Sequence, residues 1–328
     1  MRDNGVAPDS ARAKGIGMRP IAPRRIEHLL VPLDGSHLAE ASLTAATHLA
    51  TELSAHVTLL HVLERNAPAR IHGERHLTSA GEADAYLAAV ASRFADQGIA
   101  VECHAHPNPE GDVAAAIADH ASEFEADLIV LCAHGQGGMR GWLSGAMAQK
   151  IVRRSTTPLL LIRLDAAGRP PTFAPGRVLV TLDGTNHGEA ALPVAGALAM
   201  GLHLPVKLIV AVATVMTVSG DKAAAARLTP AATAAALDLK EEEMRAYLSA
   251  LAAALQAEGI VTEIELARGD AVRVITEITE RSGANILALA THGRAGLDAL
   301  WAGSVGSKVV TRVAGPLLLV HPPERTAD

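Results

Sequence analysis

The stretch LIVLCAHG at residues 128–135 returns as ILALATHG at residues 286–293. A second stretch, LLVPLDGS at residues 29–36, returns as VLVTLDGT at residues 178–185. The first pair is offset by 158 residues (286 − 128) and the second pair by 149 (178 − 29). Repeats this far apart in a chain of 328 residues indicate two copies of one domain, each large enough to bury its own core.

The expected domain boundaries follow from these repeats. The first domain takes residues 26–163, a linker with three prolines and two glycines takes residues 164–176, and the second domain takes residues 177–322. Residues 1–25 are basic and lack the apolar segment of a signal peptide, so we expect a disordered tail. The nine extra residues of the second copy (158 − 149) fall in the Ala-rich stretch 214–238, where we expect a longer helical connection.

Short continuous apolar runs alternate with helix-length segments in both copies. Such runs are typical of strands buried on both faces, and their alternation with helices predicts right-handed crossovers and a parallel sheet. The sequence therefore predicts an α/β fold of two tandem, doubly wound, five-stranded parallel-sheet domains of Rossmann-like type. In such sheets, ligands bind beyond the carboxyl ends of the strands, where the strand order reverses. The expected strands lie near residues 28–33, 56–62, 99–105, 127–132, 158–163, 177–182, 205–212, 260–266, 285–290 and 316–320, and the expected helices include 37–53, 81–97, 111–124 and 186–200.

The composition excludes several classes of function. A net charge of −6 and an aromatic content of 2% supply neither the basic field nor the stacking side chains with which proteins bind nucleic acids. The apolar stretch 190–220 is interrupted by prolines, a histidine and a lysine, so we expect no membrane-spanning helix. Cys103 and Cys132 are far apart and form no CxxC motif, which is typical of reduced thiols and a cytoplasmic location.

Candidate ligand-binding residues follow the fourth and first strands of the second copy. Gly293 and Gly303 allow backbone N–H groups to approach phosphate oxygens, and a helix starting near Gly303 and Ser304 would direct its positive end at the same anion. Asp183 can accept hydrogen bonds from ribose or adenine groups. Each residue also has a purely structural explanation, because glycines form turns, Ser304 can cap a helix and Asp183 can form an Asx turn.

Together these motifs resemble the universal stress protein family. The resemblance covers nearly the whole chain outside the tail and the linker. In the ATP-binding branch of that family, the pattern is Gly, two residues, Gly, nine residues, Gly and then Ser or Thr. The second copy departs from it at Ala290, and the first copy departs from it at Cys132 and Ala146. The motifs that carry the resemblance are THGRAG at residues 291–296, Gly303-Ser304-Val305, GPLLLV at residues 315–320 and the opening strand with Asp183-Gly184.

The resemblance implies a fold like that of the adenine-nucleotide α-hydrolases, with ATP as the ligand and no metal required by the sequence. The second copy is the preferred site, because the hydroxyl contact that Ala146 cannot make in the first copy would contribute about 0.5–1.5 kcal/mol. The implied ligand residues are Asp183, Val206 through its backbone, Gly293, Gly303, Ser304 and Val305 in the second copy, and Asp34, Val57, Gly135 and Gly145 in the first copy.

The resemblance also implies an intramolecular pseudo-dimer. The two copies would pair through their last strands, near residues 159–162 and 317–320. An apolar edge strand needs such cover, which gives the implication physical support. A homodimer of the whole chain is left open, and the sequence names no protein partner.

The remaining candidates are weaker. His72 and His76 have i, i+4 spacing, and His104 and His106 have strand spacing, but no constellation of carboxylates or cysteines accompanies either pair, so no metal site is expected. Cys132 is expected to be an inert thiol at an apolar strand end. His134 and His292 are expected to form loop hydrogen bonds, and Lys150, Arg153, Arg154, Lys308 and Arg312 are expected on the solvated face of the last helix of each copy.

No catalytic motif stands out, since the chain has no GxxxxGK[ST] loop, GxSxG elbow or HExxH helix. We therefore expect an ATP-binding regulator of the stress response and not an enzyme. The alternative is a nucleotide-free interaction scaffold of the same fold, which the departures at Cys132, Ala146 and Ala290 favour. A slow ATPase is the third hypothesis.

Overall fold

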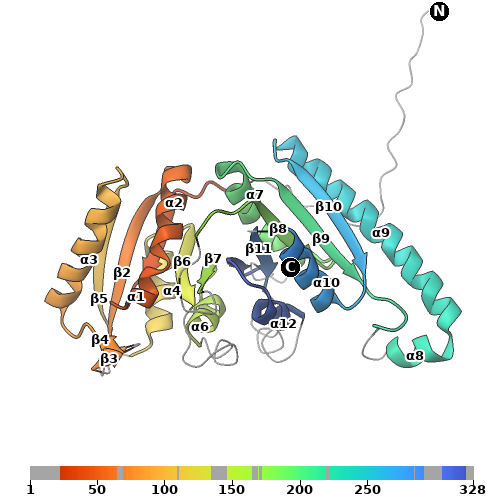
Figure 1. Cartoon of the computed structure of the whole chain (residues 1–328), viewed down its shortest axis with the longest axis horizontal. Coiled ribbons are helices and arrows are strands. Elements are labelled where there is room, and N and C mark those ends of the chain that lie inside the picture. Colours follow the sequence, from red (N-terminus) through yellow and green to blue (C-terminus); the bar gives the residue numbers. More distant parts are fainter. Residues whose placement is uncertain are drawn as a thin grey trace, which may run out of the picture.

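The computed structural model describes residues 23–64, 69–71, 73–108, 111–133, 146–164, 169, 172–218, 222–283, 285–291 and 305–322. Two similar halves follow each other along the chain, and Figure 1 shows them side by side, the first from red to yellow and the second from green to blue. The first half contains the strands β1 (His28–Pro32), β2 (His56–Glu64), β5 (Val101–Asn108), β6 (Leu128–Ala133) and β7 (Leu159–Arg163), the hairpin β3 (Arg70–Ile71) and β4 (Glu74–Arg75), and the helices α1 (His37–Glu40), α2 (Leu43–Leu53), α3 (Ala80–Ala95), α4 (Val113–Glu123) and α6 (Ala146–Arg154). The second half contains the strands β8 (Arg177–Leu182), β9 (Val206–Val212), β10 (Thr262–Arg268), β11 (Asn285–Ala290) and β12 (Leu317–Val320), the 3-10 helix η2 (Gly188–Ala191), and the helices α7 (Leu192–Gly201), α8 (Lys222–Leu228), α9 (Pro230–Ala257), α10 (Ala271–Arg281) and α12 (Val305–Arg312).

The long strands of both halves form one sheet, in the order β10-β9-β8-β11-β12-β7-β6-β1-β2-β5. Within each half the neighbouring strands are parallel, and the first strand lies between the second and the fourth, as in other doubly wound sheets. The last strands, β7 and β12, pair antiparallel, with Leu160 opposite Leu318. The predicted fold and the predicted pairing through the last strands are thus confirmed, and the pairing makes one continuous 10-stranded sheet.

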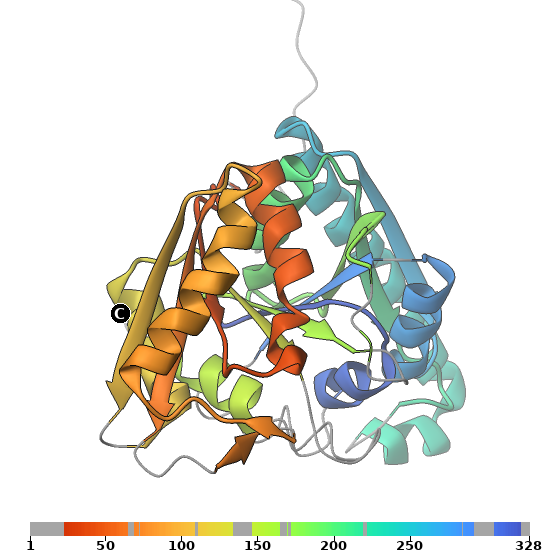
Figure 2. The same ribbon diagram turned by 60° about the vertical axis from the view of Figure 1, so that its left-hand side comes forward.

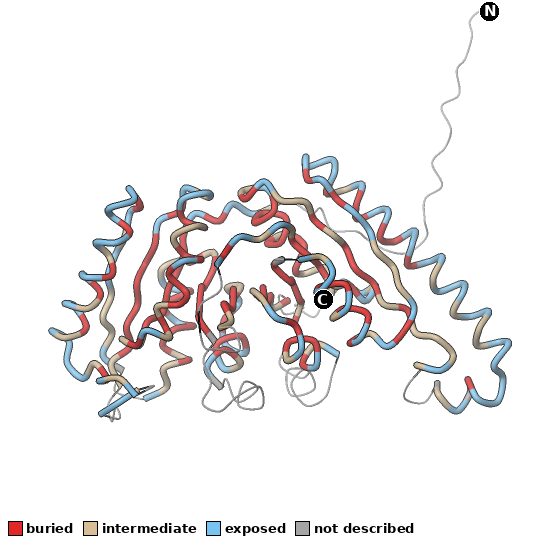
Figure 3. The backbone as a smooth tube through the Cα atoms, in the orientation of Figure 1, coloured by how far each residue is buried: buried red, intermediate tan, exposed pale blue. Residues whose placement is uncertain are grey.

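Helices cover both faces of this sheet. Successive strand residues point to opposite faces, so Leu29 and Val31 belong to the core that includes residues of α2, α3, α7 and α9, while Leu30 belongs to the core that includes residues of α4, α6, α10 and α12. Figure 2 brings the first half forward and shows α2 and α3 in front of its strands. In Figure 3 the inner strands are red, or buried, along most of their length, whereas the edge strands β5 and β10 are mostly intermediate or exposed. Burial on both faces explains why the inner strands read as continuous apolar runs.

Two of the expected helices are interrupted near their first turn. The helix expected over residues 37–53 is divided into α1 and α2, and Ser42 Oγ donates to Ala39 O at 2.8 Å where they meet. A serine hydroxyl competes in this way with the backbone ladder of a helix. The helix expected over residues 186–200 begins as η2, and Pro193 then stands in the first turn of α7, where a proline needs no backbone N–H.

The apolar stretch near residue 190 forms α7, a 10-residue helix whose side chains are mostly buried. Among the described residues, no helix is both long and apolar enough to cross a bilayer.

The two halves differ most in the connection that follows their second strand. In the first half, this connection contains the β3–β4 hairpin and leads into α3, which has 16 residues. In the second half, α8 follows a turn at residues 215–217 and leads into α9, which has 28 residues. The extra residues expected at 214–238 therefore form α8 and the first turns of α9.

Candidate functional site

The strand order of the second half reverses between β8 and β11, and a cavity of about 640 Å³ lies at the carboxyl ends of β8, β9 and β11. Sites for small molecules typically have volumes of about 300–1,000 Å³ and mostly apolar walls. Apolar residues of this cavity include Leu182, Val210, Val212, Met244, Ile275 and Leu289, and its polar residues include Asp183, His187, Thr217 and Lys240.

Asp183 follows β8 and forms the turn that leads into η2. Its Oδ1 accepts hydrogen bonds from Thr185 N at 2.9 Å and from Thr185 Oγ1 at 2.6 Å. Thr185 Oγ1 in turn accepts from Gly188 N at 3.2 Å. This is an Asx turn, so Asp183 has the structural role that the sequence left open. Among the described residues none donates to Asp183 Oδ2, which leaves this oxygen for a ligand.

Two glycines let this turn lie close to its neighbours. A Cβ at Gly188 would lie 2.6 Å from Asp183 Oδ1, so a larger residue there would displace the carboxylate. A Cβ at Gly184 would lie 2.9 Å from Met244 Sδ, and the φ of Gly184 is +79°. Few residues other than glycine adopt that backbone conformation. The position of the Asp183 carboxylate therefore depends on both glycines.

The helix α12 begins at the same cavity, where Val305 and Gly306 line it. The first N–H groups of a helix lack partners within the helix and carry the positive end of its dipole, which suits an anion. Asp183 and Val305, two of the residues predicted from the sequence, are thus brought together. The predicted residues Gly135, Gly145, Gly293, Gly303 and Ser304, and also His134 and His292, lie outside the described residues.

The long helix α9 forms a wall of the cavity through Leu237, Lys240 and Met244. It is tied to the end of β10 by Arg268, which forms ion pairs with Asp238 and with Glu241. Lys240 lines the cavity, and its Nζ forms an ion pair with Glu243 at 3.1 Å. The sequence placed an insertion in this region but gave no sign that the insertion faces the ligand site.

Val206 and Val57 are not at this end of the sheet. Val206 is the first residue of β9 and is 1% exposed, whereas the cavity is lined by Val210, Val212 and Ala213 at the other end of the strand. Six residues of strand span about 20 Å. Val57 is likewise near the start of β2 and is fully buried. The structure therefore does not bring Val206 to Asp183 or Val57 to the Asp34 turn.

The first half repeats the turn but covers it. Asp34 Oδ1 accepts from Ser36 N at 2.9 Å and from Ser36 Oγ at 2.6 Å, as Asp183 does from Thr185. The connection after β2 lies over this turn, because His37 N donates to the carboxylate of Glu74 and a Cβ at Gly35 would lie 2.8 Å from Leu77 Cγ. Among the described residues of the first half, Glu74 and Leu77 therefore lie against this turn, whereas Met244 of α9 lies there in the second half.

Two buried imidazoles complete this cover. His61 of β2 occupies the position that Val210 has in the second half (61 + 149 = 210), and its Nδ1–H donates to Leu33 O at 2.8 Å. His76 lies edge-on to it, with ring centroids 6.3 Å apart. Burial is the main cause of a lowered pKa of His61, which keeps its ring neutral at neutral pH. The sequence analysis paired His76 with His72, which lies outside the described residues.

Cys132 is buried at 2% exposure near the end of β6. Burial, together with the negative charge of Asp34, raises the pKa of its thiol to about 12. Since the thiolate is the reactive form, Cys132 is inert at neutral pH, as predicted.

The basic residues of α6 and α12 lie on the surface. Lys150, Arg153, Arg154, Lys308 and Arg312 are all exposed, as predicted. Arg154 also forms an ion pair with Asp112, the residue that caps α4. That pair joins α6 to α4.

A larger cavity, of about 870 Å³, lies at the opposite edge of the sheet, between the two halves. None of the ligand residues predicted from the sequence lines it. Its lining includes Arg24, Arg25, Ser54, His56, Ala197 and Met200.

Comparisons with known proteins agree with this arrangement. The sequence model of the Universal stress protein family matches residues 25–163 and 175–321. Universal stress protein YxiE of Bacillus subtilis (strain 168) is 29% identical over 147 residues, which are 41% of this chain and 97% of YxiE. Universal stress protein Sll1654 of Synechocystis sp. is 28% identical over 134 residues, which are 41% of this chain and 83% of Sll1654. The crystal structure of a universal stress protein from Archaeoglobus fulgidus covers 90% of this chain and 97% of its own, with a TM-score of 0.61 at 17% identity, and so shows a shared fold.

Proposed function

The chain belongs to the universal stress protein family, with two family domains in one polypeptide, and we propose that its second half binds ATP and that the bound nucleotide regulates a role in the stress response. Membership of the family supports the stress-response role. The cavity beside Asp183 is the observation that carries the proposal of a nucleotide site.

The lining of the cavity combines three kinds of group. Asp183 Oδ2 is positioned to accept a hydrogen bond from a ribose hydroxyl, while the apolar side chains of Leu182, Val212 and Met244 suit the adenine ring. The start of α12 and the ammonium group of Lys240 suit the phosphates. An adenine nucleotide combines these three kinds of group.

From the sequence, the backbone of Val206 was expected to contact adenine. In this proposal, a residue at the other end of β9 makes that contact. Val212 and Ala213 line the cavity, and Val212 O already accepts a hydrogen bond from Gly269 N at 2.9 Å. We therefore assign the backbone contact to Ala213. Gly293, Gly303 and Ser304 retain their proposed role around the phosphates.

Binding without turnover is the proposed mode of action. Asp183 and His187 are the carboxylate and the imidazole among the described residues that line the cavity. A general base for attack of water needs a free carboxylate or imidazole within reach of the phosphates. Asp183 already accepts two hydrogen bonds from Thr185 and is assigned to the ribose, and His187 already takes part in another interaction.

Calorimetric titration with ATP tests the site, with a matched pair of variants. We expect the wild type and Asp34→Ala to bind one ATP with micromolar affinity. We expect Asp183→Asn and Asp183→Ala to weaken binding at least tenfold. The asparagine variant keeps an acceptor for the Thr185 turn, so a loss there reports on the ligand and not on folding.

Two results would contradict the proposal. No heat at millimolar ATP would leave a nucleotide-free interaction scaffold as the function. Steady ADP release that disappears in Asp183→Ala would replace binding with turnover.

A further inference from the structure

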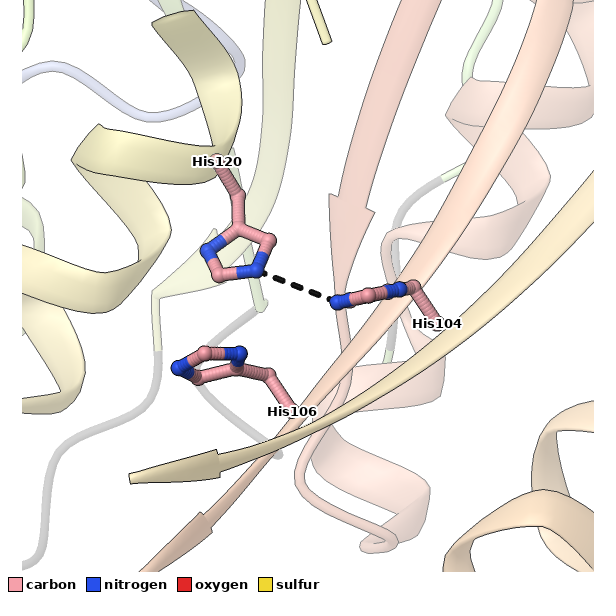
Figure 4. Close-up of side chains that lie close together, drawn as sticks. All are labelled: His104, His106 and His120. Carbon is pink, nitrogen blue, oxygen red and sulfur yellow. Dashed lines mark hydrogen bonds between the residues drawn. The ribbon is translucent and has the colours of Figure 1, made fainter. Parts of the chain in front are cut away.

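Three histidines of the first half come together on the face of the sheet that α4 covers. His104 and His106 are two residues apart on β5, so their side chains project from the same face of the strand. His120 comes from α4 and packs against both, with ring centroids 4.9 Å from His104 and 4.3 Å from His106 (Figure 4). In the sequence, only the pair on the strand stands out, which is why no metal site was expected there.

The nitrogen atoms of the three rings are close enough to share one ion. One ring nitrogen from each histidine lies within 4.8 Å of the other two, and His120 Nε2 is 3.1 Å from His104 Nε2. Tetrahedral zinc with Zn–N bonds of about 2.0–2.1 Å sets its nitrogen ligands about 3.4 Å apart. The nitrogens of His104 and His120 already have this spacing to within a few tenths of an ångström. For His106, a rotation of the ring that moves its nitrogen by about 1 Å would bring it to the same spacing.

A backbone carbonyl fixes the orientation of His120. Its Nδ1 lies 2.7 Å from Ala116 O. A carbonyl oxygen only accepts, so Nδ1 is the donor in this bond, and Nε2 is the nitrogen that faces His104. Histidines that bind metal ions are oriented by the same kind of outer hydrogen bond.

The other two rings are accessible from solvent. Both side chains are partly exposed, which gives an ion a path from solvent, whereas His120 is 5% exposed. Within the described residues, no hydrogen bond holds the His106 ring. Glu123 of α4 adds a negative charge close by, since it acts on the pKa of both strand histidines.

We propose that His104, His106 and His120 form a binding site for a divalent transition-metal ion, with Zn²⁺ as the ion that fits the three imidazoles best and a water molecule as the fourth ligand. Imidazole ligands favour zinc, copper and nickel over magnesium and calcium, which prefer oxygen. The bound ion links β5, the edge strand of the first half, to α4. The proposal does not depend on nucleotide binding.

Titration of the full chain with Zn²⁺, without a histidine tag and after removal of metal with EDTA, tests the site. We expect one equivalent of Zn²⁺ to bind with micromolar or higher affinity. Replacement by Co²⁺ should give the visible absorption of four-coordinate cobalt. At a hundredfold excess of free Zn²⁺ over the Kd, we expect the Tm to rise by roughly 5 °C.

Matched histidine variants separate this site from the other histidines. His104→Gln and His106→Gln should each weaken Zn²⁺ binding at least tenfold and abolish the cobalt spectrum. His37→Gln alters an exposed histidine of α1, with 86% of its side chain exposed, and should bind Zn²⁺ as the wild type does. Circular dichroism of each metal-free variant checks its fold.

Either of two results would overturn the proposal. The first is a metal-free wild type that binds no Zn²⁺. The second is a folded His106→Gln variant that retains the wild-type affinity and cobalt spectrum.

Discussion

The two halves share the sheet, the Asp-Gly turn and the helix that follows it, but differ in what lies over that turn. In the first half, Leu77 and two buried histidines pack there. In the second half, a cavity of about 640 Å³ remains, and α9 forms one of its walls. Leu77, His76 and α9 belong to the connection after the second strand, at the carboxyl edge of the sheet, while His61 belongs to β2 itself. The scaffold is thus shared by the halves, while the connection after the second strand gives each Asp-Gly turn different neighbours, as is common for loops on a rigid fold.

The largest expected effect on stability comes from substitutions in the β7–β12 strand pair, which test whether the two halves unfold as one unit. Leu318 and Leu160 are fully buried and opposite each other in the β7–β12 ladder. Leu318→Asp should lower the free energy of unfolding by more than about 4 kcal/mol, because it buries an unpaired charge. Leu318→Ala should cost about 2–5 kcal/mol, measured by urea denaturation.

In the same variants, the hydrogen-exchange protection of β1 reports on the first half and that of β8 reports on the second half. If the continuous sheet makes the halves cooperative, both strands lose protection in Leu318→Ala. Loss of protection in β8 alone would show that the halves unfold independently and that the comparison concerns two separate domains.

Gly188→Ala makes the second half resemble the first at one position. The matching residue of the first half is Ala39 (188 − 149 = 39). A Cβ at residue 188 displaces Asp183 Oδ1, so ATP affinity should fall about tenfold, or about 1.4 kcal/mol. The free energy of unfolding should change by less than about 1 kcal/mol, since alanine is the better residue at the start of a helix.

The reverse change, Ala39→Gly, is the control for that experiment. It should leave ATP affinity unchanged in the same calorimetric titration and lower stability by about 0.5–1 kcal/mol. Unchanged ATP binding by Gly188→Ala would show that the position of the Asp183 carboxylate does not matter.

The smallest expected effect is on the pH dependence of stability and concerns His61. The pKa of His61 is lowered in the folded state by burial, with a further contribution from His76 and opposing ones from Leu33 O, Asp34 and Glu64. The folded state therefore binds this proton less readily than the unfolded chain, so the stability that His61 provides above about pH 6.5 is lost as the pH falls through the folded-state pKa. Replacement by valine, the residue of the second half, should reduce the loss of stability between pH 7.5 and pH 5.5.

Urea midpoints at the two pH values measure this effect. The slope should be reduced and not abolished, because burial also lowers the pKa of His28. At pH 7.5 the variant should lose about 1 kcal/mol with the hydrogen bond to Leu33 O. An equal pH slope in His61→Val and the wild type would show that His61 does not contribute to the acid sensitivity of the first half.

Much of the fold was predictable because the strands are buried on both faces. Their apolar runs stand out in the sequence, and the strand ends Asp34 and Asp183 fix the repeat. The pairing of the last strands was predictable because their apolar edges need cover. The β3–β4 hairpin was missed because strands of two residues leave no periodic pattern.

The site was less predictable, since a sequence places a residue on a strand more easily than at one end of it. Val206 belongs to β9 as expected, but an apolar run of seven residues does not show which end faces the ligand. The third histidine of the first half was missed because His120 is far from His104 in sequence and comes from a helix. A usable signal was present, because a histidine between Ala116 and Ala121 on the apolar face of α4 is a buried polar group that needs partners.

Because the continuous sheet lies within one polypeptide, dilution does not separate its two halves. Two separate chains joined through such a strand pair would dissociate at low concentration and would trade partners with other chains. Here β7 and β12 belong to one polypeptide, so their association has no concentration dependence. A substitution also enters only one member of the pair. The fused arrangement thereby permits asymmetry to persist, with one member free to specialise while the other keeps it folded.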